Sequence, residues 1–115
     1  MLIADDVPAL RAMVRRILER DGRFEVIGEA QDGIEAVHLA GQLQPQVVVL
    51  DLMMPRKDGA TALAEIRRVS PASRVVILTG VGGAAQPDVD ADAWLDKGTS
   101  PHDMIRALEG LVATA

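Results

Sequence analysis

The chain has 115 residues, of which 49% are hydrophobic and 25% charged, and its 17 acids exceed its 12 bases for a net charge of −5. These values indicate one domain, residues 1–115, that is large enough to bury a core. The sequence has no cysteine, which excludes disulfides, thiol nucleophiles and cysteine-held metals. Because its only aromatic residues are Phe24 and Trp94 and its balance is acidic, the domain is poorly suited to bind nucleic acid or anionic lipid directly.

The sequence also argues against contact with a membrane. No apolar run approaches the roughly 20 residues that a membrane-spanning helix needs. Asp5 and Asp6 interrupt the N-terminus where a signal peptide needs an apolar stretch. We therefore expect a cytoplasmic protein.

The first half of the chain alternates short strands with amphipathic helices. Residues 1–4 predict a strand, and Pro8 suits the first turn of a helix that closes at Gly22. The apolar stripe of that helix recurs at helical spacing and comprises Leu10, Met13, Val14, Ile17 and Leu18. An alternating segment over 24–30 predicts a second strand. The next helix carries Ile34 and Val37 and ends near Pro45.

The second half contains two continuous β-branched runs, residues 47–50 and 75–78, which are typical of central strands covered on both faces. The helix between them carries Leu63, Ile66 and Val69. Residues 93–95 predict a last short strand. A final helix opens at Ser100-Pro101, and the apolar residues on one side of it are Met104, Ile105, Leu108, Leu111 and Val112. Strands alternating with helices predict a doubly wound α/β sheet.

Polar residues follow the predicted strands, and they carry the chemistry. They are Asp5 and Asp6 after the first strand, Asp51 after the third, Thr79 after the fourth and Lys97 after the fifth. In an open α/β sheet, ligands bind at the carboxyl ends of the strands. Carboxylates there can hold Mg²⁺, and Asp51 can act as a nucleophile toward a phosphoryl donor. Thr79 and Lys97 can then contact the phosphoryl oxygens.

Each of these residues also has an ordinary structural interpretation. The Asp5-Asp6 pair could cap the following helix, Asp51 could be a loop acid, and Thr79 could be a turn residue. Lys97 could be a surface charge and Trp94 a core residue of an edge strand. We favour the functional interpretation because the polar residues occur together, and because Lys97 is one of only two lysines among the 12 basic residues.

Other chemically notable side chains are given ordinary roles. Met53 and Met54 are interpreted as loop and packing residues. His38 and His102 are expected at solvated helix positions.

The sequence resembles the receiver domain of bacterial two-component response regulators. The resemblance covers essentially the whole chain and rests on several motifs in order, which are Leu-Ile-Ala-Asp-Asp, Val-Leu-Asp-Leu-Met-Met-Pro with Pro55 and Gly59 in the following loop, Leu-Thr-Gly, and Trp-Leu-Asp-Lys-Gly-Thr-Ser-Pro. It implies a flavodoxin-like five-stranded parallel sheet with strand order 2-1-3-4-5. It also implies phosphorylation by a sensor histidine kinase in a Mg²⁺-dependent phosphorelay.

The resemblance assigns a role to each site residue. Asp51 matches the phosphoacceptor. Asp6, Asp51 and the backbone carbonyl of Met53 match the direct Mg²⁺ ligands, whereas Asp5 matches an acid that acts through water. Thr79 and Lys97 match the switch hydroxyl and the phosphate-contacting lysine. Trp94 matches the aromatic switch, where tyrosine, phenylalanine or histidine is more usual.

Two departures from the family pattern predict altered behaviour. Residues 80–96 leave little room for a fourth crossover helix, and they are rich in glycine and contain Asp88, Asp90 and Asp92 at alternate positions. We therefore expect a shortened or degenerate helix over 80–92, which puts the usual signalling switch in doubt. The apolar side chains of Met53 and Val81 cannot orient an attacking water, so they predict slow autodephosphorylation.

The output of the domain is left open. The sequence is most like the subfamily whose receiver precedes a helix-turn-helix DNA-binding domain, so transcription control, with DNA contacted only through an output domain absent from this chain, is the first hypothesis. The alternative is an atypical or stand-alone receiver that signals by protein contacts independent of phosphorylation, and a homodimer is also open. An enzymatic role as an aspartyl-nucleophile phosphatase is disfavoured, because the acid/base position two residues past Asp51 is Met53.

Overall fold

Five parallel strands form the central sheet of the computed structural model, which describes residues 1–54, 56–80 and 90–113. The strands are β1 (Leu2–Ala4), β2 (Gly28–Ala30), β3 (Val47–Asp51), β4 (Arg74–Thr79) and β5 (Ala93–Asp96), and their spatial order is β2-β1-β3-β4-β5. All four neighbouring pairs are parallel. The expected doubly wound, flavodoxin-like sheet and its strand order are confirmed.

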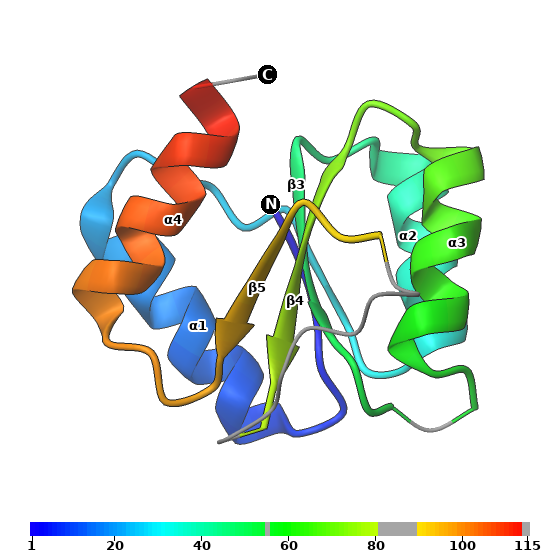
Figure 1. The fold of residues 1–115 in the computed structure, drawn as a ribbon, viewed down its shortest axis with the longest axis horizontal. Coiled ribbons are helices and arrows are strands. Elements are labelled where there is room, and N and C mark those ends of the chain that lie inside the picture. The colour runs from blue at the N-terminus through cyan, green and yellow to red at the C-terminus, as the bar shows by residue number, and fades with distance from the viewer. Residues whose placement is uncertain (55, 81–89, 114–115) are drawn as a thin grey trace.

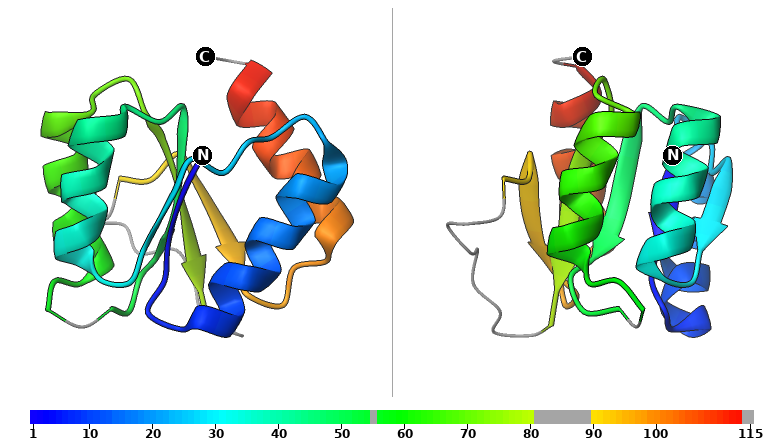
Figure 2. Two further views of the ribbon diagram at one scale, coloured as in Figure 1. Left: turned by 180° about the vertical axis from the view of Figure 1, so that it is seen from behind. Right: turned by 90° about the vertical axis from the view of Figure 1, so that its right-hand side faces the viewer.

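Helices cover both faces of this sheet. They are α1 (Pro8–Asp21), α2 (Gly33–Leu43), α3 (Gly59–Val69) and α4 (Pro101–Ala113). Figure 1 and the turned views in Figure 2 show α1 and α4 together on one face, with α2 and α3 together on the other. The Asp32 and Asp58 carboxylates cap α2 and α3 by accepting backbone N–H groups at 2.8 Å, and Gly22 ends α1 in the left-handed conformation.

Alternating side chains of the central strands divide the core into two clusters. Val48 and Leu50 point to the face that α2 and α3 cover, whereas Val47 and Val49 point to the α1 and α4 face. All of β3 is buried, and so is β4 apart from Arg74. The prediction of two central strands covered on both faces is confirmed. Trp94 packs against the first cluster and Phe24 against the second.

Some predicted boundaries and faces are wrong. The second strand is only Gly28–Ala30 rather than 24–30, because the ladder with β1 begins at the Leu2–Gly28 pair and residues 24–27 have no strand residue opposite. Ile34, Val69 and Met13 are exposed to 44%, 42% and 37%, although helical spacing placed them on apolar stripes. The buried positions of α2 are instead small residues, Gly33, Ala36 and Ala40, which let the helix approach the sheet closely.

The predicted irregular segment over 80–92 lies largely outside the described residues, as do Pro55, Val81 and Asp88. Residues 90–92, which the structure does describe, are not helical. Within the described part of the chain, no helix has the length and apolar character to cross a membrane.

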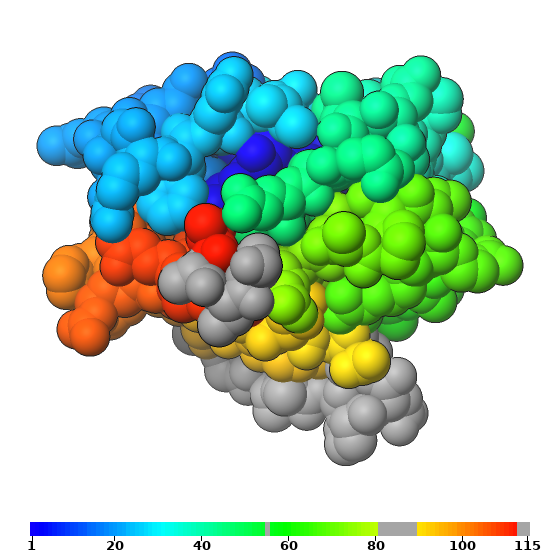
Figure 3. Space-filling view, turned by 90° about the horizontal axis from the view of Figure 1, so that it is seen from above, coloured from blue at the N-terminus to red at the C-terminus, as the bar shows by residue number. Residues whose placement is uncertain are grey.

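The carboxyl ends of the strands lie at one end of the molecule, at the bottom of Figure 1 where the arrowheads point. Figure 3 views the opposite end, where the strands begin and where the connections into β3 and β4 lie side by side. The site must therefore be sought at the end away from the viewer in Figure 3.

Gly59, the first residue of α3, packs directly on the end of β3. A Cβ atom there would lie 2.6 Å from the Asp51 carbonyl oxygen and 2.7 Å from the Leu52 Cα. The Gly59 N–H donates to the Leu52 carbonyl at 2.8 Å. Only a residue without a side chain permits this approach, so the sequence keeps α3 close to Asp51.

We predict that Gly59→Ala destabilises the domain by about 1–3 kcal/mol, because the added methyl group must displace backbone. The matched control is Gly110→Ala in α4, where a Cβ meets nothing within 4 Å. That control should gain about 0.5–1 kcal/mol through helix propensity. Urea unfolding of both variants measures the difference, and equal stability of the two would contradict the close packing of Gly59.

Candidate functional site

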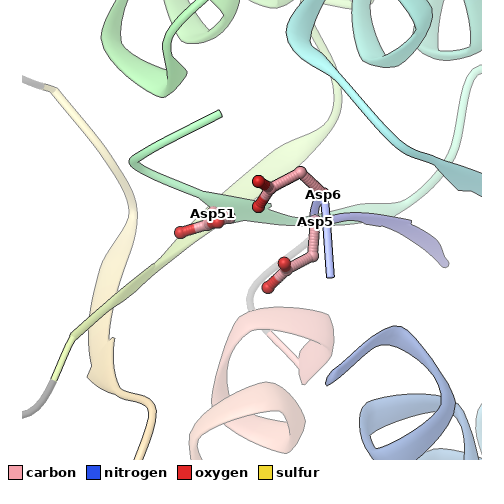
Figure 4. A group of neighbouring side chains, drawn as sticks. All are labelled: Asp5, Asp6 and Asp51. Carbon is pink, nitrogen blue, oxygen red and sulfur yellow. The ribbon is translucent and has the colours of Figure 1, made fainter. Parts of the chain in front are cut away.

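Three carboxylates meet where β1 and β3 end. Asp5, Asp6 and Asp51 each offer an oxygen, and these oxygens all lie within 4.8 Å of one another. Figure 4 shows the three side chains gathered at the ends of the two neighbouring strands. Asp5 and Asp51 are each only 2% exposed, whereas Asp6 is open to solvent. The pocket therefore combines two desolvated acids with one that a ligand can reach from outside.

Lys97, which directly follows β5, supplies a positive charge to this pocket. Its Nζ lies 3.1 Å from Asp51 Oδ1 and 3.5 Å from Asp5 Oδ2. The Lys97 side chain is 22% exposed, so it is not the freely solvated surface charge of the ordinary interpretation. One ammonium group against three carboxylates leaves the site with excess negative charge.

The local environment shifts the acidity of both partners. Burial raises the pKa of Asp51, and the nearby Asp5 charge adds to this, whereas the hydrogen bond and charge of Lys97 oppose it. Burial acts to lower the pKa of Lys97, but its contacts with Asp51 and Asp5 outweigh this, so the pKa is raised. Folding thus disfavours the ionised form of Asp51, whereas it stabilises the charged form of Lys97.

The turn from β1 to α1 orients Asp5. The Asp5 Oδ1 accepts the Val7 N–H at 2.9 Å, and the Asp5 backbone carbonyl accepts from Arg11 Nη1 at 2.6 Å. The N-cap residue of α1 is Val7, and no side chain caps it. The alternative that the acidic pair caps this helix is therefore wrong.

Arg11 is a site-supporting residue that sequence reasoning missed. Helical periodicity placed it on the polar face of α1, yet its side chain is only 17% exposed and also pairs with Glu29 of β2 at 3.3 Å. The sequence carried no signal for this, because the contact joins three separate elements.

The remaining predicted residues lie around the pocket. Thr79 is the last residue of β4 and is buried, and its carbonyl accepts the Lys97 N–H at 2.8 Å. The Met53 N–H donates to Asp51 Oδ1 at 3.3 Å, while its side chain is 76% exposed beside the pocket. Trp94 lies in the edge strand opposite Ile77 and is half-buried against the core. That placement fits the core interpretation of Trp94, and its switch role stays a prediction.

Met54 and the two histidines have the ordinary placements expected of them. Met54 is buried in the core, and His38 and His102 are exposed on α2 and α4.

The donor set fits a hard divalent cation. All three side chains offer oxygen, and Mg²⁺ prefers oxygen ligands in an octahedral shell that retains several waters. Asp5 Oδ2 is buried and accepts no hydrogen bond among the described residues, its one close contact being the ammonium of Lys97. A buried carboxylate oxygen without a donor is available to a cation or to cation-bound water.

A doubly wound sheet with an acidic pocket and a lysine at the carboxyl ends of its strands defines an α/β domain with a candidate ligand site at that edge. Comparison with known families makes the class specific. Residues 1–109 match the response regulator receiver domain, and the chain belongs to that family. Receiver domains of two-component systems bind Mg²⁺ at such a pocket and interact with histidine kinases.

The chain is similar to proteins of different lengths. It is 36% identical over 120 residues to the chemotaxis protein CheY of Listeria monocytogenes, covering all of this chain and 97% of that protein. It is 35% identical over 121 residues to the transcription regulator BvgA of Bordetella pertussis, covering 98% of this chain but only 56% of BvgA.

Solved structures show the same likeness. The CheX–CheY–BeF₃–Mg²⁺ complex of Borrelia burgdorferi matches with a TM-score of 0.87 and 27% identity, covering 96% of this chain and 86% of that one. Regulators of the LuxR family are also among the similar structures, one of them described as a DNA-binding response regulator.

The raised pKa of Asp51 yields a prediction about stability. A group whose pKa is higher in the folded state contributes stability below its unfolded pKa and loses that contribution as the pH rises through its folded pKa. At neutral pH without divalent cations, ionised Asp51 therefore costs stability. We expect Asp51→Asn to raise the melting temperature, because the neutral amide replaces a carboxylate whose charged form is disfavoured by burial.

Thermal unfolding at neutral pH and again below about pH 4 measures this effect. The gain should vanish at the lower pH, where the unfolded-state carboxyl is also protonated. Asp103→Asn, at an exposed acid of α4, is the control and should change little. A lower melting temperature for Asp51→Asn at neutral pH would mean that the Lys97 ion pair outweighs the burial of Asp51.

Proposed function

We propose that the domain accepts a phosphoryl group on Asp51 from a sensor histidine kinase in a Mg²⁺-dependent phosphorelay. The convergence of Asp5, Asp6 and Asp51 within 4.8 Å, with Lys97 Nζ 3.1 Å from Asp51 Oδ1, carries this proposal. Phosphoryl transfer to an aspartate requires a nucleophilic carboxylate, a bound cation beside it and positive charge near the phosphoryl oxygens. Asp51, the acidic cluster and Lys97 supply these groups.

The step exchanges one bond to phosphorus for another. An Asp51 carboxylate oxygen attacks the phosphorus of the phosphohistidine, forming a P–O bond as the P–N bond breaks and the imidazole leaves. In this proposal Lys97 neutralises negative charge that accumulates on the phosphoryl oxygens, and Thr79, the last residue of β4, offers its hydroxyl to one of them. Because Asp51 is buried, bulk water has little access to the attacking carboxylate.

Asp6 and Asp51 are the direct Mg²⁺ ligands in this proposal, with the Met53 backbone carbonyl as a third and Asp5 acting through water. Bound Mg²⁺ supplies charge neutralisation that lets an anionic phosphoryl donor approach three carboxylates. The similar CheY from Borrelia burgdorferi has been solved in a complex that contains BeF₃ and Mg²⁺, which supports Mg²⁺ binding by this chain.

A groove beside the pocket suits the kinase. It has a volume of about 710 Å³ and runs between α1 and α4 to Lys97. Met13, Ile17 and Ile105 give it an apolar floor, and Arg16 and Arg20 line it with positive charge. An amphipathic helix with acidic flanks, presenting a phosphohistidine at one end, fits both the lining and the position.

Transcription control is the proposed output, exerted through a DNA-binding domain outside residues 1–115. The transcription regulator BvgA and the LuxR-family regulators support it, since this chain spans only 56% of BvgA. The similarity to CheY, of which the chain spans 97%, favours the second candidate, a stand-alone receiver that acts through protein contacts. In either case we propose a cytoplasmic location, and the proposal leaves dimerisation open.

We predict that acetyl phosphate with Mg²⁺ adds one phosphoryl group to the domain, detected by intact mass. Asp51→Asn should abolish the adduct, because it removes the nucleophile, and Asp6→Asn should sharply raise the Mg²⁺ concentration required. Asp103→Asn should behave as the wild type. If no adduct forms at any Mg²⁺ concentration in the folded protein, phosphoryl transfer to Asp51 is contradicted, and a receiver that signals by protein contacts independent of phosphorylation is favoured instead.

We also predict that the aspartyl phosphate decays slowly. The exposed Met53 side chain lies beside Asp51 but offers no group to orient an attacking water. Met53→Asn should therefore accelerate decay, because its amide can hydrogen-bond a water and orient it toward the phosphoryl group. Loss of the adduct over time measures the rate, with Val69→Asn as a control at an exposed apolar residue of α3. Equal decay in both variants and the wild type would remove Met53 from this role.

A further inference from the structure

β5 differs from the three central strands, β1, β3 and β4, in how deeply it is buried. Every residue of β1 and β3 is buried, and β4 is buried apart from Arg74, but all four residues of β5 are only partly buried. β5 is also an edge strand, and among the strands of the described residues its one neighbour is β4. Burial of apolar area therefore fixes β5 less firmly than its neighbours, although Lys97 and Trp94 depend on its position.

Polar contacts of Asp92 anchor the start of this strand. The Asp92 N–H donates to the Val75 carbonyl at 2.9 Å, and its Oδ2 accepts the Val75 N–H at 2.7 Å. Asp92 therefore pairs with both the N–H and the carbonyl of Val75. These two bonds continue the pairing of β4 with β5 by one residue before β5 begins at Ala93. The Asp92 side chain is 19% exposed, so these bonds are partly shielded from water.

Two arginines tie the same carboxylate to α3 and to β4. Arg67 Nη2, in the last turn of α3, lies 3.1 Å from Asp92 Oδ2 and also donates to the Asp90 carbonyl at 2.7 Å. Arg74 Nη1, at the start of β4, lies 3.6 Å from Asp92 Oδ1. Figure 3 shows the yellow residues that lead into β5 lying against the green residues of α3 and β4.

The acidity of Asp92 is consistent with this anchoring. Partial burial acts to raise its pKa, but the Val75 N–H and the two arginines outweigh burial and lower it. Asp92 is therefore a charged acceptor at neutral pH, and its hydrogen bonds are of the stronger, charge-assisted kind.

We propose that Asp92 is a positioning residue which, by anchoring the start of β5 to β4 and α3, sets where Lys97 Nζ stands relative to Asp51. The effect is mechanical rather than electrostatic. A strand rises about 3.3 Å per residue, so Asp92 and Lys97 are separated by about 16 Å. That exceeds the screening length of about 8–10 Å at ordinary salt concentrations.

The consequence for phosphorylation rests on the proposed function. Lys97 is fixed at its own backbone by the bond from its N–H to the Thr79 carbonyl, at the far end of β5. Release at Asp92 lets the strand shift or fray from its start, which changes the angle at which Lys97 reaches across to Asp51. Asp51 ends β3, and Asp5 and Asp6 directly follow β1, so these carboxylates should stay in place.

The experiment compares Asp92→Ala, Asp92→Asn and Asp90→Ala in the whole chain. Asp92→Asn keeps an oxygen for the Val75 N–H but loses the charge, and Asp90→Ala is the matched control because only the Asp90 carbonyl is bonded to Arg67. Two readouts are taken for each variant, the rate of phosphorylation by acetyl phosphate and the Mg²⁺ concentration at half-maximal rate.

We expect Asp92→Ala to lower the rate roughly tenfold, since misplacing a catalytic group by a fraction of an ångström has effects of this order. The Mg²⁺ midpoint should stay within about twofold, because the ligand strands are untouched. Asp92→Asn should recover much of the rate. A rate for Asp92→Ala equal to that of Asp90→Ala, or a parallel loss of rate and Mg²⁺ affinity, would overturn the proposal.

A third readout keeps the test independent of phosphorylation. Trp94 is the only tryptophan of the chain and lies in β5, so its fluorescence reports on that strand alone. Acrylamide should quench it more strongly in Asp92→Ala than in Asp90→Ala. If Asp92→Ala does not fold, Arg67→Met replaces it and should show the same changes to a smaller degree. Failure of the wild type to accept a phosphoryl group counts against the proposed function, whereas unchanged quenching in the variant counts against the role of Asp92.

Discussion

The crowding of three carboxylates at one end of the sheet is the constraint on which the rest of the structure depends. Asp5, Asp6 and Asp51 come together because β1 and β3 are adjacent parallel strands and end side by side. Among the described residues, the ammonium of Lys97 offsets their mutual repulsion, and Lys97 directly follows β5, which lies beyond the intervening β4. The excess negative charge explains both the fit to a divalent cation and the raised pKa of Asp51.

The two sides of the pocket are held by different forces. The acids end or directly follow strands that are buried in the apolar core, and Gly59 and Arg11 fix the turns after those strands. The lysine lies after a lightly buried edge strand that polar contacts anchor at its start and its end. The acidic side of the pocket therefore depends on apolar burial, whereas the basic side depends on a small number of polar contacts.

Sequence reasoning worked best where a local pattern and burial agree. The β-branched runs of β3 and β4, the Pro8 and Gly22 boundaries of α1, and the five polar residues at the strand ends were all predictable. Sequence reasoning failed where contacts between distant elements set the length of a strand or the buried face of a helix. β2 is shorter than its alternation suggests because pairing with β1 sets its length, and Ile34 is exposed because small residues of α2 take the buried face. The sequence showed Asp92 only as one of several acids at alternate positions, because its partners Val75 and Arg67 are remote in sequence.

The sequence by itself determined the order of strands and helices, the two-sided burial of the central strands, and the residues that end them, since each follows from periodicity and residue type over a short window. Only the tertiary structure decided which of those residues share a pocket, how deeply Asp5 and Asp51 are buried, and that Lys97 reaches both. The physical reason is that distances between strand ends, and the burial that shifts a pKa, depend on how elements far apart in the chain pack together.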